Sequence, residues 1–440
     1  MLPQAVDGIL RSLEEAGFSA YAVGGCVRDL LLCRTPRDWD VTTSARPEQV
    51  MALFAPHAIP TGLLHGTVTV CQGGERFEVT TFRADGVYSD HRHPDSVAFS
   101  GRLEDDLARR DFTIGAMAMD RRGEIVDLFG GRDDLDRGLL RCVGDASARF
   151  EEDALRIMRL LRFASELDFS IDPDTERAAR EGCGALRYIA PERLREEMSR
   201  LLCGKAVCRV LRSYPDIIGT FLPEILPTVG LDQKNPHHCY DVWGHTAHAV
   251  ASSPPDPLIR WTLLFHDLGK GKCFTVDEGG IGHFYGHGAV SATLAEQIMA
   301  RLRFDNDSRR CILRLVDWHD RDIPRTRKSL RRALNRLGED GLRQLITVKR
   351  ADNAAQAPAY FAPVQRELDL AEEIVAELLA EDACFSLRQL AVNGRDMMAL
   401  GLRGQQIGAM LQHLLSEVLE EHLPNEREIL LHEAEQMKEV

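Results

Sequence analysis

The feature that most constrains the fold of this chain is a change in residue pattern near residue 145. Before that point, short β-rich runs alternate with helical segments, and Gly, Pro or polar turns bound the runs. The expected strands cover residues 21–23, 39–43, 67–71 and 77–82. From residue 146 onward, apolar residues recur at three- and four-residue spacing almost everywhere. The sequence therefore predicts an α+β fold, with a mixed N-terminal part followed by all-helical domains.

Length and composition narrow the class of protein. At 440 residues the chain is too long for one core, so we expect several domains. No apolar run approaches the roughly 20 residues that span a bilayer, and the N-terminus does not resemble a signal peptide. The eleven cysteines are scattered without a Cys-x-x-Cys pair. We therefore expect a cytoplasmic protein without disulfides, thiolate zinc sites or membrane partners.

The net charge of −14 argues against a nucleic-acid partner, but the charges are unevenly distributed. One stretch is rich in basic residues: Arg301, Arg303, Arg309, Arg310, Arg314, Arg325, Arg327, Lys328, Arg331, Arg332 and Arg336. A local basic face would bind nucleic acid despite an acidic total. Solvated helix faces are an equally good interpretation of this stretch alone.

The first candidate site combines a glycine loop with acidic residues. Gly24 and Gly25 follow an expected strand and let backbone amides approach a phosphate, to which Arg28 adds charge. Asp38 and Asp40 are two apart on the next expected strand, so both carboxylates should project from one face. Two adjacent carboxylates beside a phosphate site are typical of Mg²⁺ binding. Two such ions would activate an attacking hydroxyl and stabilise a departing pyrophosphate.

Glu78, on the expected strand 77–82, is the candidate third carboxylate. A single Asp-x-Asp is more often a solvated turn than a metal site. The glycine loop and Glu78 together favour the catalytic interpretation of Asp38 and Asp40.

Several motifs occur together in one order: YAVGGCVRDLLL, DWDVTT, FEVTTFR, RRDFTIGAMAMD, EDALRIMRLLRFASELDF and APERLREEM. With these motifs the chain resembles the bacterial tRNA CCA-adding enzyme and poly(A) polymerase family. The resemblance implies a polymerase-β-like nucleotidyltransferase head over residues 1–145 and a helical neck over 146–225. It further implies an HD-type helical domain over 226–360 and a tRNA-binding helical tail over 361–440.

The resemblance also implies roles for single residues. Asp38 and Asp40 would bind Mg²⁺, while Gly25, Arg28 and Arg110 would hold the incoming nucleotide, with Asp111 adjacent. The chain departs from the family at Gly115, where Asn is usual, so any side-chain contact from that position is absent.

A segment expected as one helix, residues 151–167, suggests how bases are selected. Asp153 and Arg156 are three apart, which would place them on one helix face, with Arg159 and Arg162 nearby. Cytosine and adenine both present an amino donor beside an unprotonated ring nitrogen, which fits a carboxylate and a guanidinium. Uracil and guanine present the reverse pattern and would leave buried groups unpaired. The alternative is an ordinary salt bridge between Asp153 and Arg156 on a helix surface.

A second candidate site lies in the helical part. His245, the His266-Asp267 doublet and Asp352 resemble the ligand pattern of HD-type metal phosphohydrolases, and His287 and His319 are possible accessory groups. Imidazole and carboxylate ligands together suit Mn²⁺, Ni²⁺, Zn²⁺ or Fe²⁺ better than Ca²⁺. A degenerate, structural HD domain is the alternative. Two further histidines, His237 and His238, are expected at the surface.

Four interpretations follow from these sites. A complete CCA-adding enzyme, using tRNA, CTP and ATP without an obligatory protein partner, agrees best with the motifs. A poly(A) polymerase would usually carry a basic C-terminal extension, whereas this tail is acidic. Enzymes adding only CC or only A share the same motifs. CC-adding members of the family typically lack an intact flexible loop, whereas the segment FRADGVYSDHRHPDSVAF resembles a complete one and favours full CCA addition. An HD phosphohydrolase with an RNA-binding head is the alternative from another class.

Overall fold

The computed structural model describes residues 2–85, 97–322, 324–381 and 383–438. By its internal contacts the chain divides into two compact units, Met1–Pro223 and Glu224–Val440. The division lies close to the expected boundary at residue 225, and the finer four-domain division stays a prediction. The expected flexible loop, FRADGVYSDHRHPDSVAF, covers residues 82–99, and its residues 86–96 lie outside the described residues.

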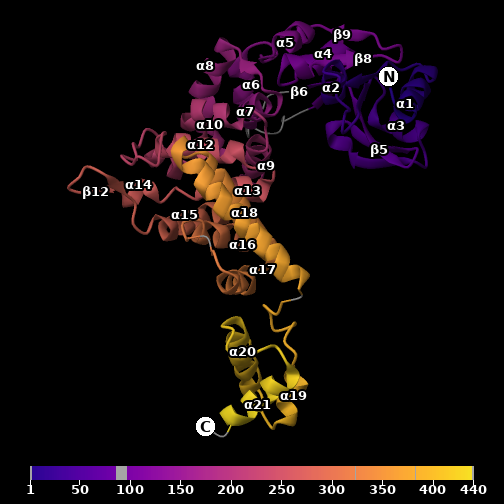
Figure 1. The fold of residues 1–440 in the computed structure, drawn as a ribbon. Coiled ribbons are helices and arrows are strands. Elements are labelled where there is room, and N and C mark those ends of the chain that lie inside the picture. Colours follow the sequence, from indigo (N-terminus) through magenta and orange to yellow (C-terminus); the bar gives the residue numbers. More distant parts are fainter. Residues whose placement is uncertain (1, 86–96, 323, 382, 439–440) are drawn as a thin grey trace. The chain divides into compact units, whose positions relative to one another are not determined.

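The N-terminal unit begins with a mixed β-sheet that includes β5, β8 and β9 (Figure 1). Its seven strands have the order β3-β4-β5-β2-β1-β8-β9. Four strands correspond to the expected ones: β1 (Ala20–Val23), β2 (Asp40–Thr43), β4 (Thr67–Gln72) and β5 (Glu75–Thr81). The sequence did not predict β3 (Ala58–Gly62), β8 (Met117–Met119) and β9 (Ile125–Asp127). A separate antiparallel pair joins β6 (Arg83–Asp85) to β7 (Val97–Phe99). The α+β fold class is thereby confirmed.

Two helices cover one face of this sheet. They are α1 (Gln4–Glu15) and α3 (Pro47–Leu53). The α1 residues Ile9 and Leu13 pack with Val41 of β2 and Val79 of β5 in one fully buried cluster. Each such side chain contributes roughly 1.5–3 kcal/mol through burial. Because side chains alternate along a strand, the neighbours of these valines must point to the opposite face.

Further helices of the head are α2 (Gly25–Leu31), α4 (Leu103–Ala108) and α5 (Gly131–Arg137), with short 3₁₀ turns at Leu63–His65 and Thr113–Gly115. Leu107 of α4 packs with Val23 of β1 and Ala118 of β8 in a second buried cluster. These contacts hold α4 against the central strands. Asp106 of α4 lies beside β2, where it accepts a hydrogen bond from Thr42.

Helices dominate the rest of the first unit, as expected. They are α6 (Ala146–Glu152), α7 (Leu155–Leu167), α8 (Pro173–Gly182), η3 (Cys183–Tyr188), α9 (Pro191–Leu202), α10 (Val207–Ser213) and α11 (Pro215–Ile218). A two-stranded parallel pair joins β10 (Leu139–Leu140), which precedes α6, to β11 (Ser170–Ile171), which lies between α7 and α8 in the sequence. The α7 helix packs closely against α9 and supplies the buried centre of this region.

The second unit is also helical, apart from one small hairpin of β12 (Thr275–Val276) and β13 (Gly282–His283). Its helices are η4 (Pro223–Thr228), α12 (Val242–Ser252), α13 (Pro257–Phe265), α14 (Lys270–Cys273), α15 (His287–Arg301), α16 (Asn306–Trp318), α17 (Arg327–Ala354), α18 (Pro358–Ala380), α19 (Gly394–Ala399), α20 (Gln405–Leu419) and α21 (Arg427–Lys438). Gly338 interrupts α17 with a positive φ of 72°. One buried cluster joins α16, α17 and α18, and another joins α19, α20 and α21.

Two further observations bear on the expectations from composition. All eleven cysteines lie in the described part of the chain, and each is a free thiol. Among the described residues, no helix combines the length and the apolar character that crossing a bilayer requires.

Candidate functional site

The three predicted carboxylates of the head meet on the open face of the sheet. Asp40 and Glu78 are direct partners in the parallel pairing of β2 and β5. Partial burial raises the pKa of Asp40, Arg110 opposes this shift, and the nearby charges of Glu78 and Asp38 reinforce it. The β2 strand begins at Asp40, so Asp38 precedes the strand instead of lying on it as expected. Its carboxylate nevertheless lies close enough to act on Asp40.

These oxygen-only groups fit a divalent cation. Three carboxylates repel one another unless a cation or a proton lies between them. Burial is the main cause of the raised pKa of Asp40, and the charges of Glu78 and Asp38 add to it. Mg²⁺ prefers one or two protein carboxylates together with substrate phosphates. The donor set therefore fits the predicted metal.

A pocket of about 300 Å³ lies beside the carboxylates. Its lining comes from both the head and the neck: Gly24, Gly25, Arg28, Asp40, Arg110, Asp111, Phe112, Ile114, Gly115, Arg159, Arg162, Phe163 and Arg200. Gly24 has a φ of 82°, and a Cβ there would lie 2.7 Å from an Arg110 guanidinium nitrogen. A residue with a side chain would thus strain the backbone and displace Arg110. The structure brings together seven of the nine predicted nucleotide-binding residues.

Asp106, which the sequence did not predict as a site residue, positions two arginines. Its fully buried carboxylate pairs with Arg109 at 2.7 Å and with Arg110 at 3.2 Å, and Thr42 donates to it at 3.2 Å. Burial tends to raise the pKa of Asp106, but the two guanidinium groups lower it below the usual value. The sequence signal that could have identified Asp106 is the motif DLARR, in which the two arginines follow the aspartate by three and four residues.

The neck side of the pocket is held by a second ion pair. Asp111 accepts a hydrogen bond from Arg159 Nε at 2.5 Å. Burial tends to raise the pKa of Asp111, but the charges of Arg159 and Arg156 outweigh it and lower the pKa to about 2. Arg162 lies over the Phe163 ring at 4.0 Å and pairs with Glu197 at 2.6 Å. The pocket is therefore lined by cations whose positions are fixed by acidic partners.

Asp153 and Arg156 are the two remaining predicted nucleotide-binding residues, and their positions contradict part of the sequence prediction. Residues 151–167 do not form one helix, because α6 ends at Glu152 and Asp153 is extended, with φ −142° and ψ 102°. The Asp153 carboxylate accepts from the backbone amide of Leu155 at 3.0 Å and so starts a new helix. The pair therefore does not share one helix face, although the two residues stay close in sequence.

Both side chains also carry partners within the protein. Asp153 pairs with Arg193 at 3.2 Å. Arg156 donates to Glu152 at 2.5 Å and to the backbone carbonyls of Arg149 and Arg109. Neither residue lines the pocket in this arrangement, and their role in base selection stays a prediction.

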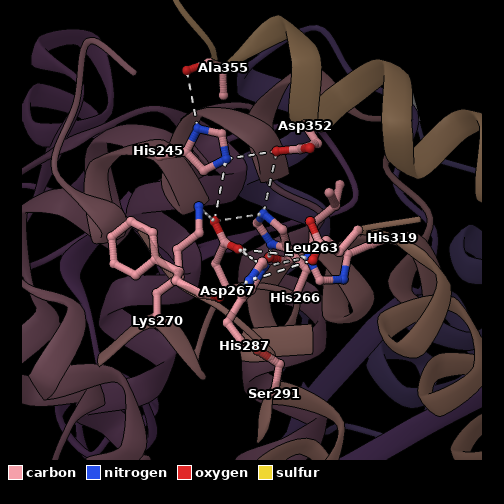
Figure 2. Close-up of polar contacts among 12 residues, drawn as sticks. His245, Leu263, His266, Asp267, Lys270, His287, Ser291, His319, Asp352 and Ala355 are labelled. Atoms are coloured by element: carbon pink, nitrogen blue, oxygen red, sulfur yellow. Dashed lines mark hydrogen bonds and ion pairs between the residues drawn. The ribbon is translucent and has the colours of Figure 1, made fainter. Parts of the chain in front are cut away.

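The second unit gathers all six predicted histidine and aspartate residues into one place (Figure 2). We call this group the histidine–aspartate cluster: His245, His266, Asp267, His287, His319 and Asp352. The four histidines and Asp267 are at most 7% exposed. They come from α12, the segment after α13, the start of α15, the end of α16 and the last turn of α17.

The cluster contains two groups with metal-ligand spacing, and both use Asp267. One joins Asp267 to His245 and His266, and the other joins it to His287 and His319. Within each group the candidate ligand atoms lie within 4.8 Å of one another. Asp352 Oδ1 approaches His245 Nε2 at 2.7 Å and His266 Nε2 at 3.5 Å.

Each of the four imidazoles is oriented by a backbone carbonyl that accepts a hydrogen bond from Nδ1. The acceptors are Ala355 at 3.2 Å from His245, Leu263 at 2.6 Å from His266, Phe284 at 2.9 Å from His287 and Val316 at 2.6 Å from His319. Because a carbonyl only accepts, Nδ1 carries the proton in each ring, and Nε2 faces the cluster (Figure 2). This is how metal-binding histidines are commonly held.

The polar atoms at the centre of the cluster provide a test of whether a metal fits. His266 Nε2 and Asp267 Oδ2 are buried 3.2 Å apart, and Lys270 Nζ lies 2.8 Å from the same Asp267 oxygen. The Nε2 atoms of His287 and His319 face each other at 3.2 Å, where two lone pairs would repel. Burial lowers the pKa of His266, but Asp267 and Asp352 raise it to about 10. The cluster thus attracts positive charge, and its donor set fits a divalent cation.

His238, expected at the surface, instead lies beside this cluster. Its ring packs edge-on against His245, with ring centroids 5.2 Å apart, and its Nδ1 is buried without a partner. Burial, together with Lys270 and His245, lowers the pKa of His238 to about 3. The sequence showed only an isolated histidine pair, and no spacing connected it to the cluster.

Most basic residues between 301 and 336 pair with carboxylates, and a nucleic-acid-binding face at this stretch stays a prediction. Arg301 pairs with Glu224 at 2.8 Å, Arg325 with Glu367 at 3.1 Å, and Lys328 with Glu420 at 2.9 Å. Further pairs join Arg309 to Glu296, Arg310 to Asp307, Arg327 to Glu377, Arg331 to Glu421 and Arg332 to Glu420. Acidic residues distant in sequence, notably in the tail, offset these charges.

Comparisons with known proteins agree with this geometry. The family described as the poly A polymerase head domain matches residues 20–141. The probable RNA and SrmB-binding site of polymerase A matches residues 168–214, and a putative tRNA nucleotidyltransferase domain 2 matches residues 289–434. The fold and the head pocket therefore define a protein of the nucleotidyltransferase class.

Individual relatives are more specific. The chain is 51% identical over 256 residues to a CCA-adding enzyme of Lactobacillus delbrueckii. The matched region covers 58% of this chain and 62% of that protein. It is 35% identical over 426 residues to a CCA-adding enzyme of Levilactobacillus brevis, covering 96% of this chain and 95% of the relative. A crystal structure of the Bacillus stearothermophilus CCA-adding enzyme in complex with CTP covers 100% of this chain and 98% of its own, with 32% identity and a TM-score of 0.75. The chain belongs to the CCA-adding enzyme family.

Proposed function

We propose that this protein adds CCA to the 3′ end of tRNA from CTP and ATP, without a nucleic-acid template and with release of pyrophosphate. The observation that carries the proposal is the pocket where Gly24, Gly25, Arg28 and Arg110 meet Asp40. Membership of the CCA-adding enzyme family supports the same activity. We expect the protein to act in the cytoplasm on tRNA without a protein partner.

The head residues would divide the work of nucleotidyl transfer. Backbone amides of Gly24 and Gly25 would approach the triphosphate, and Arg28 and Arg110 would offset its charge. Asp38 and Asp40, with Glu78 beside them, would hold Mg²⁺. When bound, Mg²⁺ polarises the reacting phosphate and lowers the pKa of the attacking hydroxyl. Asp106 would act through Arg110 by holding its guanidinium in place.

Asp153 and Arg156 would select cytosine and adenine, but only after exchanging partners. Arg156 now donates to Glu152, and Asp153 accepts from Arg193. A base edge that offers an amino donor beside a ring acceptor would replace both contacts. Uracil and guanine would leave the two buried charges unsatisfied, which is the stronger cost.

Extension assays on defined tRNAs test the proposal. The substrates are tRNAs that end before, within and after CCA, supplied with each nucleoside triphosphate separately and then with CTP and ATP together. Complete addition predicts CC from CTP alone, A only onto tRNA ending in CC, and no extension past CCA. Extension by ATP without limit would favour a poly(A) polymerase, and a stop after CC or addition of A alone would favour a partial enzyme.

We propose a second activity, a metal-dependent phosphohydrolase, for the histidine–aspartate cluster. The observation that favours it is the gathering of four Nε2 atoms around Asp267, in two groups with metal-ligand spacing. Imidazole and carboxylate ligands suit Ni²⁺ or Mn²⁺, unlike the oxygen ligands of the head. A bound cation would supply Lewis-acid stabilisation to a phosphoryl group. The expected substrates are phosphomonoesters and 2′,3′-cyclic phosphates.

A matched set of variants separates the two activities. His266→Ala and Asp267→Asn should abolish hydrolysis of p-nitrophenyl phosphate and 2′,3′-cyclic AMP in Ni²⁺ or Mn²⁺, while CCA addition by the same preparation persists. Asp40→Ala is the reciprocal variant, expected to lose CCA addition and keep hydrolysis. If the wild-type protein binds no metal and hydrolyses neither compound, the cluster is structural and this second proposal is wrong.

A further inference from the structure

His238 lies beside the histidine–aspartate cluster, but the hydrogen bonding of its ring differs from that of the cluster histidines. Each of the four cluster histidines donates Nδ1–H to a backbone carbonyl and presents Nε2. His238 has the opposite arrangement, because its Nδ1 is the buried atom without a partner. A histidine meant as a permanent metal ligand would normally have its second nitrogen anchored in this way. His238 is therefore suited to a partner that binds reversibly.

The segment that carries His238 is fastened at several points. The His237 carbonyl accepts from the backbone amide of Ala357 at 2.8 Å, and Asn235 donates to the Gly282 carbonyl at 3.5 Å. The His238 amide itself donates to the Asn235 carbonyl at 3.0 Å. His237 also stacks on Tyr360, with ring centroids 3.8 Å apart. The His238 ring thus keeps its place against His245 without any hydrogen bond from Nδ1.

The surroundings of His238 contain one lysine and two carboxylates of the cluster. Lys270, which lies 2.8 Å from Asp267 and also donates to Gln233, brings a buried positive charge near the ring, and Asp267 and Asp352 bring smaller opposing effects. A cation held by the cluster would neutralise the negative charge of Asp267. The positive charge of Lys270 would then be less offset and could attract an anion. An imidazole has at least one N–H in every protonation state, so it can always donate to a phosphoryl oxygen. A buried, unpaired nitrogen gains most from such a bond.

We propose that His238 Nδ1 donates a hydrogen bond to a phosphoryl oxygen of the ester that the cluster hydrolyses. His238 is then a substrate-contacting residue and not a metal ligand. The inference rests on the proposed hydrolase function, since a phosphate must bind at the cluster for the contact to exist. It identifies the phosphoryl group, common to phosphomonoesters and cyclic phosphates, as the part of the substrate that is recognised.

The test compares His238→Ala with the wild-type full chain, using Mn²⁺ and inorganic phosphate as probes. Metal content and Mn²⁺ affinity should stay unchanged, while the Kd for phosphate, measured by calorimetry on the Mn²⁺-loaded protein, rises about 10- to 100-fold. The KM for p-nitrophenyl phosphate should rise by a similar factor. His238→Asn should restore part of the loss, because its amide nitrogen falls near the position of Nδ1.

His237→Ala is the matched control, because it removes a neighbouring side chain that helps to hold the same segment but keeps the His238 ring and its Nδ1. It should bind phosphate like the wild type, and an equal loss in both variants would show that His238 acts only by packing, against the proposal. A loss of Mn²⁺ binding in His238→Ala would make it a ligand, which also overturns the proposal. If the wild type binds Mn²⁺ and hydrolyses its substrate but His238→Ala binds phosphate normally, only this inference fails. If the wild type binds no Mn²⁺, the hydrolase function fails and the inference with it.

Discussion

The ion pair between Asp111 and Arg159 allows a quantitative prediction for the replacement Asp111→Asn. Asp111 follows the head helix α4, whereas Arg159 belongs to α7, and their side chains meet at 2.5 Å. The pKa of the Asp111 carboxyl falls from 3.8 to about 2, because Arg159 and Arg156 outweigh its burial. A shift of this size corresponds to roughly 2 kcal/mol of stability at neutral pH, which the uncharged Asn would lose.

The sign of the pH dependence follows from the lowered pKa. Stability from a depressed carboxyl pKa is fully present above the unfolded-state value near 3.8 and is lost as pH falls towards about 2. The difference between wild type and Asp111→Asn should therefore be constant from about pH 5 upward and about half as large at pH 3. A repacking defect caused by the amide would give a difference that does not change with pH.

Amide hydrogen exchange measured by mass spectrometry suits this test, because a chain of several domains has no single free energy of unfolding. Peptides from α7 should show the loss. Arg177→Gln, which breaks an exposed ion pair with Asp174 on α8, is the matched control and should change protection by less than about 1 kcal/mol. Equal protection of α7 in wild type and Asp111→Asn at pH 7 would refute the reasoning.

Three predictions concern catalysis. Asp40→Ala should lower nucleotide incorporation by about a thousandfold or more with tRNA affinity kept, because metal-ion stabilisation contributes several kcal/mol; near-normal extension would contradict this. Asp153→Ala and Arg156→Ala should each reduce discrimination against UTP and GTP by about 1.5–3 kcal/mol, measured as ratios of kcat/KM, and unchanged ratios would place selection elsewhere. Gly115→Asn should fit, since a Cβ there meets no atom within 4 Å, and should lower the KM for CTP about two- to tenfold; an unchanged KM would mean that the added amide makes no contact.

Local patterns made part of this molecule predictable from its sequence. The strands β1, β2, β4 and β5 were expected from short apolar runs between turns, and each is present within a few residues of its expected ends. The pairing of Asp40 with Glu78 joins two strands that were predicted separately. The resemblance to one family supplied the ligand set of the histidine–aspartate cluster, which no local pattern would have assembled.

The features that the sequence did not predict have a common physical origin in contacts that local patterns do not encode. The apolar spacing of residues 151–167 continues through Asp153, but this residue is extended, and its carboxylate accepts from the Leu155 amide at the point where the expected helix is interrupted. The basic stretch was judged by its own sequence, whereas Glu420 and Glu421, almost a hundred residues later, pair with it. His238 reaches the cluster through an irregular segment whose path depends on bonds to Ala357 and Gly282.

The anchoring of the cluster histidines has a consequence for how this site tolerates mutation. His266, His287 and His319 each bond to the carbonyl of the residue three positions earlier in the chain, Leu263, Phe284 and Val316. Backbone atoms are common to all residues, so those three neighbours are free to vary over generations without altering where the ring proton resides. His245 differs, because its acceptor, Ala355, is more than a hundred residues away at the end of α17. Of the four rings, His245 is therefore the one whose proton position depends on correct long-range docking, and the one most vulnerable to substitutions far from the site.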